Sequence, residues 1–175
     1  MAPFDPGLHR TACLALFDDN VIASHRPDGT FRPEERVEFQ RFLDDLPGPY
    51  FVVTGEEQAA GREGGVVACG GWAREDQPGL LSLCWTVVAA ARQGEGLGRL
   101  LVEGVVGEAR EAVVAGGSTV AEEGCLPSGV PPRLRLDTIP ATRGFFEAMG
   151  FSVVEVDPEG YGPASPPRVE MVRPL

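Results

Sequence analysis

The stretch RQGEGLGR, residues 92–99, places three glycines at alternate positions between two arginines. The glycines are Gly94, Gly96 and Gly98, and from Gly96 onward leucines and valines recur at helical spacing. Glycines at the start of a helix leave backbone amides that a ligand can approach closely, and the positive end of the helix dipole favours an anion there. The residue types and their spacing therefore indicate a site for a pyrophosphate group.

Three other interpretations of the same glycines can be compared with the sequence. A P-loop requires a lysine followed by serine or threonine, and the chain contains no lysine. A dinucleotide fingerprint that begins at Gly94 and Gly96 requires its third glycine at position 99, where Arg99 stands. A tight turn between a strand and a helix, with no ligand, stays open as the structural alternative.

The elements around this motif can be predicted from hydrophobic periodicity. Apolar runs predict strands over residues 11–17, 50–54, 65–74 and 80–88, of which the last three form an antiparallel meander. A first helix over residues 33–46 presents an apolar stripe to the core, and a long helix begins at Gly96. Residues 115–132 are rich in glycine, proline and small polar side chains and predict a mobile loop. A strand over 133–138, a helix over 140–150 and strands over 151–156 and 168–172 complete the chain.

Length and composition bound the class of protein. A chain of 175 residues predicts one domain, residues 1–175. The net charge of −11 and the absence of lysine argue against nucleic acid as a partner. Four cysteines far apart in the sequence give no metal-site spacing and are expected to be reduced. No apolar run approaches the roughly 20 residues of a membrane span and no signal peptide is recognisable, so we expect no membrane and a cytoplasmic location.

Two segments together resemble the GNAT superfamily of acyl-CoA-dependent N-acetyltransferases. Residues 93–98, QGEGLG, match the family signature Q/R-x-x-G-x-G/A and lie, as in the family, between a hydrophobic strand and a long helix. Residues 144–151, GFFEAMGF, look like the family's late helix-to-strand segment. The resemblance implies an α/β (α+β) fold, with a mixed, mostly antiparallel sheet of about six to seven strands, splayed at its centre between residues 83–88 and 133–138 and flanked by helices.

The resemblance also implies which residues hold acetyl-CoA, the acyl-donor cosubstrate. Backbone groups at the end of one strand would bind the pantetheine arm, and the glycine-containing loop would bind the pyrophosphate. In the order of the chain these residues are Thr86, Val87 and Val88, followed by Gln93, Gly94, Glu95, Gly96, Leu97, Gly98 and Arg99.

The chain departs from the family at the usual proton donor. Many relatives carry a tyrosine at the position that aligns with Phe146, and phenylalanine cannot protonate the departing thiolate. Tyr161 is a candidate acid or substrate contact, with an ordinary loop aromatic and a water molecule as alternatives. Asp137 is the slightly preferred base, although it could equally cap the next helix, and Glu75, Asp76, Asp18 and Asp19 are other candidates.

These residues lead to two hypotheses of different classes. The first is an N-acetyltransferase that moves an acetyl group directly from acetyl-CoA to a primary amine of an unidentified small acceptor. The alternative is a non-catalytic module that binds acyl-CoA as a sensor or structural unit, and it is motivated by Phe146. A homodimer is left open, and no metal is expected.

Overall fold

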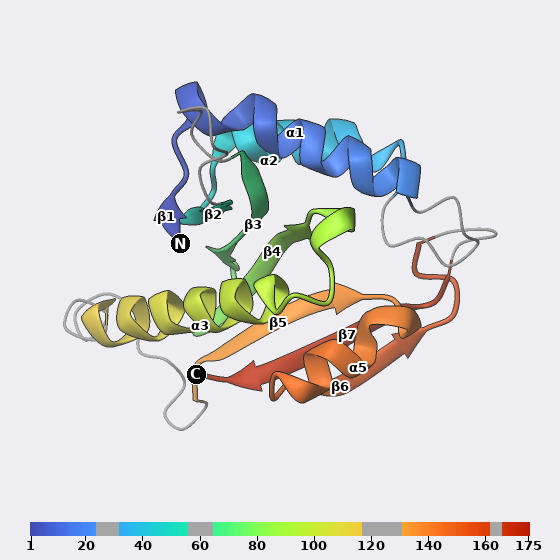
Figure 1. The fold of residues 1–175 in the computed structure, drawn as a ribbon. Helices are drawn as coiled ribbons and strands as arrows, with labels where there is room; N and C mark the ends of the chain where they lie inside the picture. The colour runs from blue at the N-terminus through green and yellow to red at the C-terminus, as the bar shows by residue number, and fades with distance from the viewer. Residues whose placement is uncertain (24–31, 56–64, 117–130, 162–165) are drawn as a thin grey trace. The chain divides into compact units, whose positions relative to one another are not determined.

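The computed structural model describes residues 1–23, 32–55, 65–116, 131–161 and 166–175 (Figure 1). The predicted loop at 115–132 lies largely outside these ranges. The helical elements are α1 (Pro6–Ala23), α2 (Glu35–Asp45), the short 3-10 turn η1 (Ala90–Arg92), α3 (Leu97–Gly116) and α5 (Pro140–Ala148). The strands are β1 (Ala2–Pro3), β2 (Tyr50–Thr54), β3 (Val66–Arg74), β4 (Leu80–Val88), β5 (Arg133–Thr138), β6 (Ser152–Asp157) and β7 (Arg168–Pro174).

Within the described ranges, seven strands form one mixed sheet in the order β1-β2-β3-β4-β5-β7-β6. The pairs β1–β2, β2–β3, β5–β7 and β6–β7 are antiparallel. β4 and β5 pair in parallel over Leu80–Ser82 and Arg133–Arg135. The hairpin that joins β3 to β4 is closed by a hydrogen bond of 3.0 Å from the Glu75 amide to the Leu80 carbonyl.

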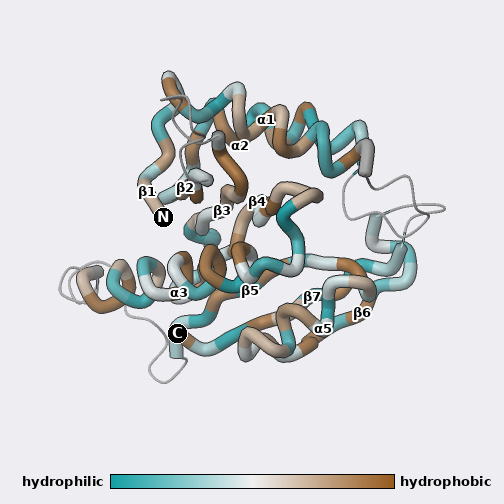
Figure 2. The backbone as a smooth tube through the Cα atoms, viewed as in Figure 1, coloured by the Kyte–Doolittle hydropathy of each residue, from teal (hydrophilic) through white to brown (hydrophobic). Residues whose placement is uncertain are grey.

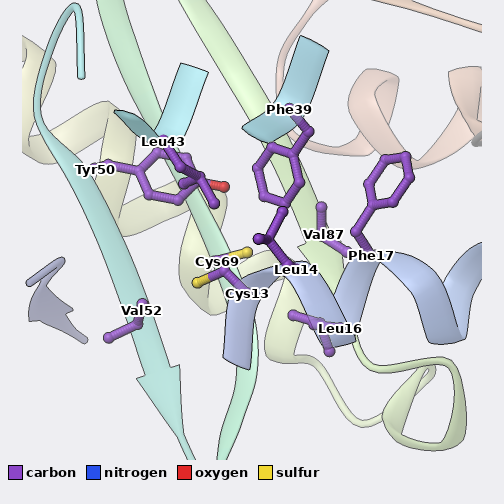
Figure 3. Close-up of a cluster of buried hydrophobic side chains, with 10 residues drawn as sticks. All are labelled: Cys13, Leu14, Leu16, Phe17, Phe39, Leu43, Tyr50, Val52, Cys69 and Val87. Atoms are coloured by element: carbon purple, nitrogen blue, oxygen red, sulfur yellow. The ribbon is translucent and has the colours of Figure 1, made fainter. Parts of the chain in front are cut away.

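The described chain separates into two compact units, of which the first comprises Met1–Gly71 and Cys84–Val102. Its core joins α1 and α2 to β2, β3 and the end of β4 (Figure 3). The rings of Phe17 and Phe39 stack 5.4 Å apart, and both residues are fully buried. Gly71 in β3 has no room for a side chain, because a Cβ there would lie 2.2 Å from the Pro49 carbonyl oxygen.

The second unit comprises Trp72–Leu83 and Glu103–Leu175. Its antiparallel strands β5, β7 and β6 carry alternating buried residues such as Leu134, Leu136 and Met171. α5 ends at Ala148, and Gly150 follows the C-cap residue Met149 with a φ of +81°, the left-handed conformation that glycine commonly supplies after a helix. The Arg173 guanidinium donates to the Met149 carbonyl at 2.7 Å and so caps the end of this helix.

One sequence prediction is wrong at the N-terminus. Residues 11–17 were expected to form a strand, but they lie inside helix α1. Asp5 caps this helix by accepting hydrogen bonds from the amides of Gly7 and Leu8, and Pro6 occupies its first position, where a missing N–H costs nothing. Both hydrophobic and hydrophilic residues occur along the whole length of α1 (Figure 2). The buried residues Cys13, Leu14, Leu16, Phe17 and Asn20 follow helical rather than strand spacing.

The other predicted elements are confirmed within two residues at each end, apart from Pro33 and Glu34, which precede α2. Phe39 and Leu43 of the predicted stripe are fully buried, and Phe42 and Leu46 pack against the same core. Cys13, Cys69 and Cys84 are free thiols, whereas Cys125 lies outside the described residues. No helix in the described part of the chain is long and apolar enough to cross a membrane.

Candidate active site

The C-terminal half of β4 contains an unusual backbone conformation. Trp85 has a φ of +44°, a left-handed value that a bulky residue in a strand rarely adopts. Its carbonyl accepts a hydrogen bond of 2.8 Å from the Tyr50 hydroxyl, and its ring packs 5.1 Å from that of Phe39. These contacts hold Trp85 in its irregular conformation, and β4 continues beyond it through Thr86 to Val88.

The peptide group at the end of β4 is held at both of its polar atoms. The Val88 carbonyl accepts a hydrogen bond of 2.9 Å from the Asn20 side chain on α1. The Ala89 amide donates to the Val67 carbonyl in β3 at 2.8 Å. A strand end fixed in this way can present neighbouring backbone groups in a constant orientation.

The glycine loop has the geometry that an anion site requires. Gly94 and Gly96 have φ values of +85° and +84°, and a Cβ at either position would meet no atom within 4 Å. The space over the loop backbone is therefore open. α3 begins at Leu97, its first bond runs from the Leu100 amide to the Gly96 carbonyl, and its first turn contains no acidic residue. The first-turn amides that point back toward the loop suit a diphosphate, so the residues present fit acetyl-CoA.

Gly70 in β3 lets α3 approach the sheet closely in the first unit. A Cβ on Gly70 would lie 3.1 Å from the Leu101 side chain and 3.3 Å from the Thr86 Cα. The Thr86 hydroxyl is buried on this side and has no hydrogen-bond partner among the described residues. The close packing holds the beginning of α3, and hence the loop before it, against β3.

The charged residues of the loop are partly paired with each other. The Arg92 guanidinium lies 2.6 Å from the Glu95 carboxylate, and each side chain is a little under half exposed. Neutralising Glu95 in this way limits its repulsion of a phosphate. Arg99 is an exposed residue in the first turn of α3.

Asp137, the preferred base, lies at an exposed position of β5 in the second unit. Its carboxylate pairs with Arg168 at 3.0 Å and with Arg135 at 3.3 Å. It does not cap α5, because the N-cap of that helix is Ile139, without a side-chain cap hydrogen bond. The side chain is thus committed to two guanidinium groups, which would compete with an amine proton for the same oxygens.

The other base candidates from the sequence also have identifiable surroundings. Asp18 pairs with Arg36 of α2 at 2.6 Å, and Glu75 hydrogen-bonds the Ser82 hydroxyl. Asp19 and Asp76 are exposed.

Tyr161 and Phe146 also belong to the second unit. Tyr161 is half-buried in the turn that follows β6, just before residues 162–165, which the structure does not describe. Phe146 is 9% exposed and contacts Phe151 and Phe145 edge-to-face, with ring centroids 5.8 and 5.0 Å away. Phe146 is therefore a buried residue of α5 that packs against the exposed Phe145 in the same helix and the buried Phe151 beyond its end.

The structure brings the predicted cofactor residues together in the first unit, and Asp137 and Tyr161 lie in the second. Sequence reasoning missed two features of the first unit. The conformation of Trp85 has no sequence signal, because tryptophan rarely adopts a positive φ. Asn20 could have been found only after residues 11–17 had been recognised as helical, since it then falls on the buried face with Cys13 and Phe17.

Comparison with known proteins identifies the family. The family model described as "Acetyltransferase (GNAT) family" matches residues 18–151, which is more than half of the chain. The chain therefore belongs to the GNAT acetyltransferase family, and acetyl-CoA is its acyl donor. No match was found among curated proteins.

Solved structures agree with this assignment. A structure described as a GNAT-family acetyltransferase from Desulfovibrio desulfuricans is 26% identical, with 95% of this chain and 94% of that chain covered and a TM-score of 0.60. The ribosomal-protein-S18-alanine N-acetyltransferase from Escherichia coli is 15% identical, with 99% and 92% covered and a TM-score of 0.63. A Salmonella typhimurium protein solved with acetyl-CoA is 18% identical, with 95% and 90% covered and a TM-score of 0.59. The predicted fold class, a mixed and mostly antiparallel sheet flanked by helices, is confirmed.

Proposed function

We propose that the protein is an N-acetyltransferase that moves an acetyl group from acetyl-CoA directly to a primary amine of a small acceptor. The observation that carries the proposal is the open loop with left-handed Gly94 and Gly96 at the start of α3, directly after the irregular end of β4. In a chain of this family, such a loop has no evident purpose other than holding the acyl donor.

Each part of the site then has a role. The amides of the loop and of the first turn of α3 bind the pyrophosphate, and Arg99 adds positive charge. The backbone of Thr86 to Val88 orients the pantetheine arm, and an amide near Val88 stabilises the negative charge that develops on the carbonyl oxygen. Bound acetyl-CoA supplies the thioester, whose C–S bond is replaced by a C–N bond to the amine.

Two proton transfers remain for this chain's own residues or for water. The attacking amine must lose a proton, and Asp137 would have to leave an arginine partner to accept it. The leaving thiolate must gain a proton, which Tyr161 or a water molecule would supply. In this proposal, residues 1–175 form a single domain that acts in the cytoplasm and binds neither nucleic acid nor a membrane. Light scattering would show whether the protein forms a homodimer.

The alternative, a module that binds acyl-CoA without turnover, is favoured by two observations. Phe146 carries no hydroxyl and is buried among aromatic rings, and Asp137 is held by two arginines. Both weaken the proton-transfer machinery and leave the binding loop intact.

Thiol release from acetyl-CoA separates the two functions. The protein should be assayed with polyamines, amino acids, aminoglycoside-type antibiotics and peptides with free N-termini; the peptides are included because one structural neighbour acetylates a ribosomal-protein alanine. Amine-dependent release that Gly96→Val reduces supports the transferase. Binding of acetyl-CoA by calorimetry without release for any amine supports the module, and absence of binding contradicts both.

A further inference from the structure

Asn20 on α1 is a buried polar residue whose hydrogen bonds reach two parts of the proposed acetyl-CoA site. It is 5% exposed, and its amide nitrogen donates to the Leu16 carbonyl and to the Val88 carbonyl, each at 2.9 Å. Its amide oxygen accepts a hydrogen bond of 3.2 Å from the Gln93 side chain. Both donors and one acceptor position of the side chain are therefore used.

These contacts fix the orientation of the Asn20 amide. The two groups on the nitrogen side are carbonyl oxygens, which can only accept, so the atom that faces them must be the nitrogen. Its oxygen is then the atom directed at Gln93. The bond to Leu16 is local to the helix, whereas the bonds to Val88 and Gln93 span 68 and 73 residues of sequence.

Helical stability does not explain this arrangement. Asparagine is a poor helix former, and burying its amide is costly unless every group is paired. An apolar residue among the neighbouring core side chains would stabilise α1 at least as well. What asparagine adds is a link from a rigid helix to the end of β4 and to the first residue of the glycine loop.

We propose that Asn20 is a positioning residue for the acetyl-CoA site, holding Val88 and Gln93 in their binding orientation before the ligand arrives. This inference rests on the proposed role of the loop. The Asn20 bond to the Val88 carbonyl and the Val67 bond to the Ala89 amide pin one peptide group from both sides. The Asn20 bond to Gln93 holds the entry to the loop, and this order lowers the entropy that binding must otherwise remove.

The first test is Asn20→Asp, which keeps the size of the side chain and removes both donors. A second variant, Asn20→Ser, is smaller and keeps a hydroxyl. We expect acetyl-CoA to bind about 10-fold more weakly to each variant by calorimetry, which is about 1.4 kcal/mol. KM for acetyl-CoA should rise by a similar factor while kcat changes less, since Asn20 touches no reacting atom. Amide exchange over residues 88–96 should become faster in the ligand-free variants.

A matched control separates positioning from general loosening of α1. Cys13→Ala removes a fully buried side chain from the same helix and leaves the Asn20 hydrogen bonds unchanged. It should lower Tm by an amount comparable to the Asn20 variants but leave the Kd for acetyl-CoA unchanged. Equal weakening by Cys13→Ala would overturn the inference, as would unchanged affinity in either folded Asn20 variant.

A double-mutant cycle with Gln93→Ala tests the link to the loop. If Asn20 acts partly through Gln93, the product of the fold-changes in Kd for the two single variants should be larger than the fold-change for the double variant. Independent effects would limit the role of Asn20 to Val88 and contradict the inference as stated. Failure of the unmodified protein to bind acetyl-CoA would instead contradict the proposed function.

Discussion

At the scale of single residues, the strongest constraint on the proposed site is the left-handed backbone of its glycines. We expect Gly96→Val to weaken acetyl-CoA binding at least 10-fold, because the branched side chain would occupy the open space over the loop amides. The φ of +84° also adds strain of about 1–2 kcal/mol for a residue with a Cβ. Calorimetry measures the affinity, and thermal unfolding measures the strain.

Gly150→Ala serves as the control for strain alone. Gly150 has a φ of +81° at the end of α5, and its added Cβ would make only an ordinary contact with Arg173. This variant should lose stability but bind acetyl-CoA normally. Normal affinity in a folded Gly96→Val protein would show that the loop does not hold the pyrophosphate.

Tyr50 joins the irregular strand to the core, and its ionisation should limit stability at high pH. Burial raises the pKa of Tyr50 well above 10.0, and the neighbouring Cys69 thiol raises it further. Above a pH of about 10 the unfolded chain loses this proton while the folded chain keeps it, so stability falls as the pH rises.

Tyr50→Phe should therefore lower the free energy of unfolding at pH 7 but make it less dependent on pH above 10. At pH 7 it removes the hydroxyl that donates to the Trp85 carbonyl, and we expect a loss of about 1 kcal/mol. Above pH 10 its stability should decline less steeply than that of the parent. Denaturant unfolding between pH 7 and 11 measures both effects, and parallel curves would refute the assignment.

Phe146 is the position where proton donation departs from the family pattern. The residue is 9% exposed, so the hydroxyl of Phe146→Tyr needs a polar partner or a path to the leaving sulfur. If protonation of the leaving thiolate limits turnover, the variant should raise kcat by about 10²-fold or more. Loss of turnover in Tyr161→Phe that disappears in the Phe146→Tyr background would identify Tyr161 as the acid. Equal activity of the parent and Tyr161→Phe across pH would leave water as the donor.

At the scale of secondary structure, the sequence was most informative where periodicity and caps agreed. α2, α3, α5 and the strands β2 to β7 were recognised because their apolar spacing is bounded by glycine, proline or polar clusters. The loop before α3 was located for the same reason. Whether its residues bind the acyl donor is a separate prediction, which the loop geometry supports and the binding experiments test.

The strand predicted over residues 11–17 is wrong because the prediction used the apolar run alone and overlooked the helix-capping residues that precede it. The signal lies upstream, where Asp5 and Pro6 mark a helix start, and downstream, where Asn20 continues the buried face. The conformation of Trp85 could not have been predicted, since it depends on the tertiary contacts with Tyr50 and Phe39.

The contact between α1 and α2 should contribute to the acid sensitivity of the fold. Arg10 on α1 pairs with Asp44 on α2 at 2.6 Å, and this hydrogen bond lowers the pKa of the Asp44 carboxyl below its usual range. A lowered pKa in the folded state gives stability at pH above the unfolded value of about 4, and this contribution is lost as the pH falls through the folded value.

Asp44→Asn should accordingly flatten the decline in stability below pH 4. Asp45→Asn makes the same change of charge at the next residue and is the matched control. Circular dichroism at pH 2–6 with urea measures the slope for each protein. The ion pair contributes nothing to acid sensitivity if the two variants behave alike.

At the scale of the whole molecule, the net charge of −11 acts on both substrates, and it acts in opposite directions. Acetyl-CoA carries negatively charged phosphates, whereas a protonated amine acceptor is a cation. Raising the salt concentration from 10 to 150 mM shortens the Debye length from about 30 to about 8 Å, so that only local charges remain effective.

The association rate of acetyl-CoA should therefore rise with salt, even though the loop itself attracts phosphate. The kcat/KM for a cationic amine should fall over the same range, and that for a neutral acceptor should stay nearly constant. Stopped-flow binding and steady-state assays at matched pH measure these trends. A cationic acceptor whose kcat/KM does not depend on salt would show that the acidic surface serves solubility and does not attract the acceptor.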